Sequence, residues 1–137
     1  MKEKIKGKWE TGKTEKDELE ALIQKVIGCC IRVHMTLGPG FLESVYQNAL
    51  EVECAENGLT VESEKEIHLQ YHDHHVGTHR LDFLVDRQLV VELKTAEKLN
   101  GQHYAQVRSY LKATGTRVGL LVNFAEAKLD PRRVELA

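Results

Sequence analysis

The sequence predicts a domain of the α/β (α+β) class, because its hydrophobic period changes twice along the chain. Over residues 19–58 apolar side chains recur every three or four positions, which is typical of amphipathic helices. Over residues 67–95 they alternate with polar ones, as in strands. The helical period returns over residues 97–114 and is followed by a short apolar run. We therefore expect two helices, consecutive strands, a third helix and a buried strand.

Length and charge limit the kind of protein this can be. Its 137 residues suffice for one domain with a hydrophobic core, which we assign to residues 17–137, after a polar arm at residues 1–16 that we expect to be flexible. With 19 Lys and Arg against 21 Asp and Glu, the net charge of -2 provides no overall field to attract nucleic acid or an anionic membrane. No apolar stretch approaches the roughly 20 residues that cross a bilayer, and the Lys-rich start lacks the apolar centre of a signal peptide, so we expect a cytoplasmic protein.

The first two predicted helices are separated by "LGPG". The first presents one apolar stripe, made of Leu19, Leu22, Ile23, Val26, Ile27, Cys30 and Ile31. His34 falls on the same stripe, and Pro39 cannot continue the helix. The second helix is expected from Phe41 to a cap at Gly58, with a core face of Leu42, Val45, Tyr46, Ala49 and Leu50. Three cysteines without a CxxC pair, Cys29, Cys30 and Cys54, favour buried free thiols over a redox or zinc role.

Three antiparallel strands are expected in the middle of the chain. Residues 67–71 alternate, "HDHH" supplies a polar turn, and residues 80–95 read as a hairpin. In the helix that follows, Tyr104, Val107 and Leu111 face the core and Gly115 ends the helix. Residues 117–124 are apolar enough for a buried strand, and the tail allows one more edge strand.

The hairpin carries charges where a sheet would prefer uncharged residues. Its odd positions form a wholly apolar face, which we expect in the core: Leu81, Phe83, Val85, Leu89, Val91 and Leu93. If the turn is centred on Arg87, residues whose numbers sum to 174 lie opposite each other. Asp82 then faces Glu92, with Cβ atoms about 4.5–5.5 Å apart.

Two carboxylates opposed across a sheet repel each other unless a cation lies between them. A divalent ion would satisfy both, and oxygen ligands of this type suit Mg²⁺ or Mn²⁺. Lys94 projects from the same face as Glu92 and could orient a water or stabilise charge on phosphorus. In the alternative reading, a solvated charged edge, Lys94 and Arg80 simply neutralise the two acids. The hairpin alone leaves both readings open.

The pattern of Asp82 followed across the hairpin by Glu92-Leu93-Lys94 resembles the PD-(D/E)XK nuclease superfamily. "GFLESVY", residues 40–46, is similar to the motif of the GxxExxY protein family, a bacterial and archaeal group in that superfamily, and the similarity spans about residues 18–124. The resemblance implies a restriction-endonuclease-like core over residues 17–137, with a mixed central sheet of about four to five strands flanked by helices.

The resemblance also implies roles for individual residues. Four are implied to be catalytic: Glu43, Asp82, Glu92 and Lys94. The three acids would hold one or two ions of Mg²⁺ or Mn²⁺. Gln106 and Tyr110 are similar to the QxxxY motif of RecB-like and lambda-exonuclease-like members and would bind substrate; their spacing of four puts them on one helix face. His34 also matches a histidine typical of these proteins. On an apolar stripe such a residue is more often a core histidine, so His34 is a weak metal candidate.

Two further patterns favour ordinary explanations. Five of the seven histidines lie between His68 and His79. Consecutive residues of a tight turn point apart, so we prefer a polar turn to a zinc or nickel site. The lysines of the predicted arm could track a phosphate backbone, but interspersed glutamates dilute their charge.

The resemblance implies a Mg²⁺-dependent nuclease that hydrolyses phosphodiester bonds in DNA. The alternative is a catalytically silent module that retains the nuclease fold and binds nucleic acid or protein. The domain has no accessory recognition element or basic surface of its own, which motivates this alternative. A homodimer with paired active sites, or a partner protein, is a further possibility.

Overall fold

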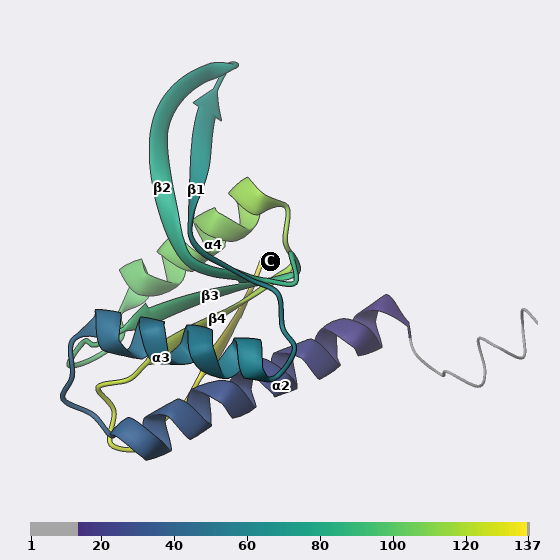
Figure 1. Cartoon of the computed structure of the whole chain (residues 1–137). Coiled ribbons are helices and arrows are strands. Elements are labelled where there is room, and N and C mark those ends of the chain that lie inside the picture. The colour runs from purple at the N-terminus through teal and green to yellow at the C-terminus, as the bar shows by residue number, and fades with distance from the viewer. Residues whose placement is uncertain (1–13, 137) are drawn as a thin grey trace, which may run out of the picture.

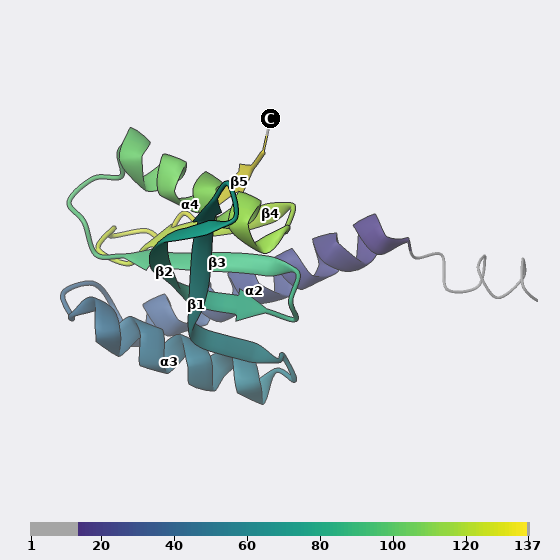
Figure 2. The same ribbon diagram turned by 90° about the horizontal axis from the view of Figure 1, so that it is seen from above.

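A five-stranded mixed sheet with helices on both faces forms the part of the chain that the computed structural model describes, residues 14–136 (Figures 1 and 2). Its elements, in chain order, are α2 (Glu15–Leu37), α3 (Glu43–Glu56), β1 (Val61–Tyr71), β2 (His74–Val85), β3 (Leu89–Lys94), α4 (Gly101–Thr114), β4 (Val118–Asn123) and β5 (Arg132–Glu135). The strand order in space is β1-β2-β3-β4-β5. The predicted fold class is confirmed.

Helix α2 begins at Glu15, after the N-cap residue Thr14, so its first two residues fall in the segment 1–16 that we assigned to the N-terminal arm. Most of that segment lies outside the described residues. The Thr14 hydroxyl accepts a hydrogen bond from the Asp17 backbone N–H at 3.2 Å, and the Thr14 N–H donates to the Asp17 carboxylate at 3.3 Å. The helix ends where Gly38 adopts a φ of 71° and donates to the His34 carbonyl oxygen. The predicted stripe is largely buried, but Ile31 is exposed.

Helix α3 begins at Glu43, two residues later than predicted. Gly40 has a φ of 114°, and the Phe41 backbone N–H donates to the hydroxyl of Tyr46, so the chain is still extended there. Leu42 is therefore the N-cap and is 76% exposed, and its predicted place in the core was wrong. Tyr46 and Leu50 are buried as predicted.

The three consecutive antiparallel strands are confirmed as β1, β2 and β3. His72 and Asp73, with φ of 50° and 65°, form the polar turn between β1 and β2. Pairing of Phe83 with Val91 and of Val85 with Leu89 confirms the predicted register. Helix α4 then crosses over, so that β4 pairs parallel to β3 at the centre of the sheet.

Helix α4 begins at Gly101, later than the predicted residue 97. The Asn100 side chain accepts hydrogen bonds from the backbone N–H groups of Gln102 and His103 and so fixes the start of the helix. Gly115 ends it with a φ of 70°, as predicted. The tail adds β5 as an edge strand antiparallel to β4.

Beyond the sheet, β1 and β2 continue as a two-stranded extension that curves away from the body (Figure 1). This β-arm, called the arm below, is distinct from the predicted N-terminal arm of residues 1–16. The pairing of β2 with β3 ends at Phe83, whereas β1 and β2 stay paired out to Tyr71 and His74. The alternation of strand faces breaks at this point, where Glu64, on β1 between the partners of Phe83 and Leu81, has a φ of 49°. Leu81 accordingly packs in the cluster on the α4 side and not with Phe83 on the side of α2 and α3. The predicted single apolar face of the hairpin is therefore wrong at Leu81.

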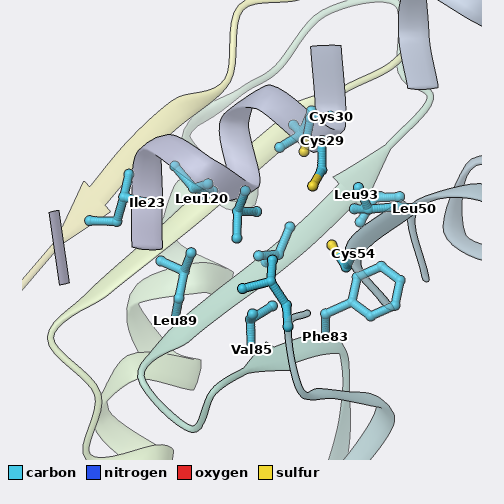
Figure 3. Close-up of a cluster of buried hydrophobic side chains, with 14 of the residues drawn as sticks. Ile23, Cys29, Cys30, Leu50, Cys54, Phe83, Val85, Leu89, Leu93 and Leu120 are labelled. Carbon is cyan, nitrogen blue, oxygen red and sulfur yellow. The ribbon is translucent and has the colours of Figure 1, made fainter. Parts of the chain in front are cut away.

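The larger core lies between the sheet and helices α2 and α3 (Figure 3). Its three cysteines, Cys29, Cys30 and Cys54, are free and buried, as predicted. Burial raises the pKa of the Cys54 thiol to about 12 and also raises that of Cys30, so both stay protonated. Within residues 14–136, no helix combines the length and apolar character that a membrane crossing requires.

Candidate active site

The two opposed acids lie where β2 and β3 separate. Past the Phe83–Val91 pair, the strands are joined through side chains in place of the backbone ladder. The Asp82 backbone N–H donates to Glu92 Oε2 at 2.7 Å, and the Leu93 N–H donates to Asp82 Oδ2 at 2.8 Å. Each carboxylate thus caps the opposite strand, and the backbone holds both acids at the point of separation.

Each of these carboxylates keeps one oxygen without a hydrogen bond from any residue of the described chain. Glu92 is only 3% exposed, and Asp82 is partly buried. Neither acid forms an ion pair within residues 14–136, since Arg80 pairs with Glu66 at 3.4 Å and Lys94 donates to an amide oxygen. The neutralising pairs of the solvated-edge reading are therefore not formed in the described chain, and two acceptor oxygens remain available for a cation.

The electrostatics of the site disfavour full ionisation. Burial, followed by the charge of Asp82, raises the pKa of Glu92 to about 8. Burial also raises the pKa of Asp82. The pKa of Glu43, the first residue of α3, is raised by burial and then by the charge of Asp82, against the lowering effect of Lys94. Three carboxyl groups thus share one region, and the positive charge of Lys94 only partly offsets the effects of burial and of their mutual repulsion.

Lys94, the last residue of β3, is held toward α4. Its Nζ donates to Gln106 Oε1 at 3.1 Å. Tyr110 lies one turn further along α4, and burial together with the charges of Glu92 and Asp82 raises its pKa to about 12. From their spacing we expect Gln106 and Tyr110 on one face of the helix, next to its apolar stripe and not within it. Tyr110 is instead buried within the apolar cluster on the α4 side.

The loop before Glu43 is anchored by Tyr46. The Tyr46 hydroxyl donates to the Gly38 carbonyl oxygen and accepts from the Phe41 N–H. Its ring stacks on Phe124, with ring centroids 4.7 Å apart. Tyr46 therefore fixes the loop from which Glu43 enters the site, which gives a physical reason for the spacing of glycine, glutamate and tyrosine in "GFLESVY".

His34 has a structural partner in the core. Its Nε2 lies 2.7 Å from the backbone oxygen of Glu126, and because a carbonyl oxygen only accepts, Nε2 carries the hydrogen. The ring is 7% exposed and packs near Phe124. No described contact links His34 to the acids, so its weak candidacy as a ligand gains no support.

The site contains one residue that the sequence analysis did not select, His79 on β2. Its Nδ1 lies 3.4 Å from the Tyr110 hydroxyl, and the two rings meet edge to face at 5.5 Å. The sequence groups His79 with the histidines of the polar turn. Its place on β2, two residues before Leu81 and hence on the same strand face, was the signal that could have separated it from them.

The donor set fits a hard divalent ion with few protein ligands. Within residues 14–136, no group of three or more His, Cys, Asp or Glu side chains is gathered closely enough to hold a metal ion. Asp82 and Glu92 alone offer two oxygens, and Mg²⁺ commonly binds through one or two carboxylates, with waters and phosphate oxygens completing its shell. Glu43 lies within electrostatic reach of the pair.

Comparisons with known proteins agree with this architecture. The family model for the PD-(D/E)XK nuclease superfamily matches residues 20–134. A solved structure described as SSO0001 has the same fold, with a TM-score of 0.52 and 20% identity over 67% of this chain. The match spans 48% of that chain, so this protein corresponds to about half of its length. No curated protein sequence matches. From the match over most of its length, we conclude that the chain belongs to the PD-(D/E)XK nuclease superfamily.

Proposed function

We propose that this domain is a Mg²⁺- or Mn²⁺-dependent nuclease that hydrolyses phosphodiester bonds in DNA. The observation that carries the proposal is the pair of opposed acids. Asp82 and Glu92 are locked in place by backbone N–H groups, yet each keeps an oxygen that no described residue satisfies. The raised pKa values of both acids indicate that their charged forms are disfavoured in the metal-free protein, a cost that a purely structural role would not require.

The surrounding residues suit phosphodiester hydrolysis. A divalent ion held by Asp82 and Glu92 would supply Lewis acidity and charge neutralisation at the scissile phosphate. The Lys94 ammonium, held by Gln106, would donate to a phosphate oxygen and stabilise the charge that develops there. Glu43, with its raised pKa, would take up or release a proton beside that phosphate.

Within the superfamily, we place the chain in the GxxExxY group. Support comes from the anchored loop, in which Tyr46 fixes the entry of Glu43 into the site and Gly40 supplies the required φ of 114°. A substitution at Tyr46 should therefore disturb Glu43 as well as the core.

A catalytically silent module that binds nucleic acid or protein is the second candidate. It is favoured by the absence of a gathered three-ligand group within residues 14–136 and by the net charge of -2 over the whole chain. The two candidates differ in their need for a metal. A module does not require one, whereas the nuclease does.

The test is a cleavage assay on the full chain with duplex DNA, single-stranded DNA and RNA. We expect cleavage of DNA in Mg²⁺ or Mn²⁺ and none in EDTA. Nucleic-acid binding without cleavage in either metal would favour the module. Equal cleavage in metal and in EDTA would contradict the proposed chemistry.

A further inference from the structure

The base of the arm carries the one described contact to the hydroxyl of Tyr110. His79 Nδ1 lies 3.4 Å from that hydroxyl oxygen, and within residues 14–136 the hydroxyl forms no other hydrogen bond. Tyr110 is 4% exposed, whereas His79 is partly buried and therefore reachable from solvent. The contact joins β2, which carries Asp82, to α4, which carries Gln106.

Two arrangements of this hydrogen bond are possible, because a hydroxyl has one hydrogen and an imidazole nitrogen either donates or accepts. If the hydroxyl donates to His79, its lone pairs face the site and repel a phosphate. If His79 donates, the hydroxyl hydrogen is free to turn into the site. Only the second arrangement lets Tyr110 bind an anion.

The charges around Tyr110 favour the second arrangement. Val90 packs in the same cluster as Tyr110, and Glu92, two residues further along β3, projects from the same strand face. The charges of Glu92 and Asp82 accordingly contribute to the raised pKa of Tyr110. A hydroxyl dipole beside negative charge is most stable with its hydrogen turned toward that charge. Its oxygen then faces His79, whose Nδ1 must carry a hydrogen to complete the bond.

We propose that His79 is a positioning residue of the nuclease site: it donates from Nδ1 to the Tyr110 hydroxyl and turns the hydroxyl hydrogen toward the acids, where it donates to a nucleic-acid phosphate. The effect of His79 on substrate binding rests on the proposed nuclease function. The geometry of the pair, however, is a property of the folded protein in the absence of substrate.

Three substitutions separate this role from simple packing. In His79→Asn the amide nitrogen takes the place of Nδ1, in His79→Gln it reaches toward the place of Nε2, and His79→Ala removes the donor. We expect His79→Ala and His79→Gln to raise the KM for DNA about tenfold with little change in kcat, as for a lost binding contact. His79→Asn should retain most of the wild-type KM.

The same change in a Tyr110→Phe background completes the test. Without the hydroxyl, His79→Ala should raise KM no further. The inference is overturned if the effect of His79→Ala persists in that background, because His79 would then contact substrate itself. It is also overturned if His79→Asn is as impaired as His79→Ala while both unfold at the wild-type temperature.

A measurement without substrate tests the pair even if the protein cleaves nothing. Nitrogen-15 NMR of the histidine rings should show a hydrogen on Nδ1 of His79 in the wild type, and Tyr110→Phe should shift that nitrogen resonance. A neutral ring with its hydrogen on Nε2 would overturn the inference. If the cleavage assay alone fails, the proposed function is contradicted, whereas the NMR measurement still decides whether His79 donates to Tyr110.

Discussion

Replacing Asp82 with Asn is expected to lower metal-dependent cleavage at least about 100-fold while leaving the domain folded. Asn keeps an oxygen that can accept from the Leu93 N–H, so the link between β2 and β3 survives. It removes the negative charge that a divalent ion requires and relieves the repulsion from Glu92. Initial rates in saturating Mg²⁺, together with thermal unfolding, measure both effects.

A matched control lies in the same hairpin. Asp73 is an exposed acid at the tip of the arm with a φ of 65°, a conformation that Asn tolerates. Asp73→Asn should cleave at the wild-type rate. If Asp82→Asn retained more than about a tenth of wild-type activity, a loss far smaller than removal of a catalytic charge produces, the assigned role of Asp82 would be wrong.

Replacing Glu92 with Gln is expected to stabilise the metal-free protein by about 1–3 kcal/mol at pH 8. The pKa of Glu92 is raised from 4.5 to about 8 by burial and by Asp82. The stability that its protonated form contributes is complete below pH 4.5 and is lost as the pH rises through 8. Gln keeps an acceptor for the Asp82 N–H and does not titrate, so its advantage grows with pH.

Urea unfolding in EDTA at pH 5 and pH 8 measures this difference. The advantage of Glu92→Gln over wild type should be smaller at pH 5, where Glu92 is protonated in the folded protein. Glu66→Gln is the control, because Glu66 is an exposed acid of the arm whose ion pair with Arg80 is worth little. Two results would contradict the assigned repulsion between Glu92 and Asp82. One is a Glu92→Gln protein that is less stable than wild type at pH 8, and the other is a stability advantage over wild type that is larger at pH 5 than at pH 8.

The register of the charged hairpin could be predicted because local signals agreed there. Strand alternation and the turn at Arg87 both specify that residues summing to 174 face each other, and the pairing of Phe83 with Val91 confirms it. The face of Leu81 could not be predicted from alternation. Phe83 and Leu81 pack in different clusters, and Glu64, which lies on β1 between their two partners, has a φ of 49° that no local pattern indicates.

The rest of the site depended on segments distant in sequence. Glu43 and the pair Gln106 and Tyr110 were selected by resemblance, since no local pattern shows which helix ends meet a strand end. The burial of Tyr110 and its contact with His79 arise from the packing of α4 against the base of the arm. The start of α3 differs from the prediction for a local reason, because the Phe41 backbone N–H donates to the Tyr46 hydroxyl.

We propose above all that Asp82 and Glu92 share a divalent ion. Anomalous diffraction from crystals grown in Mn²⁺ tests it most directly. The account predicts a manganese peak within about 2.3 Å of one oxygen from each acid, on the oxygens that accept no hydrogen bond from the described chain. Crystals saturated with Mn²⁺ that show no peak between these two carboxylates would contradict it.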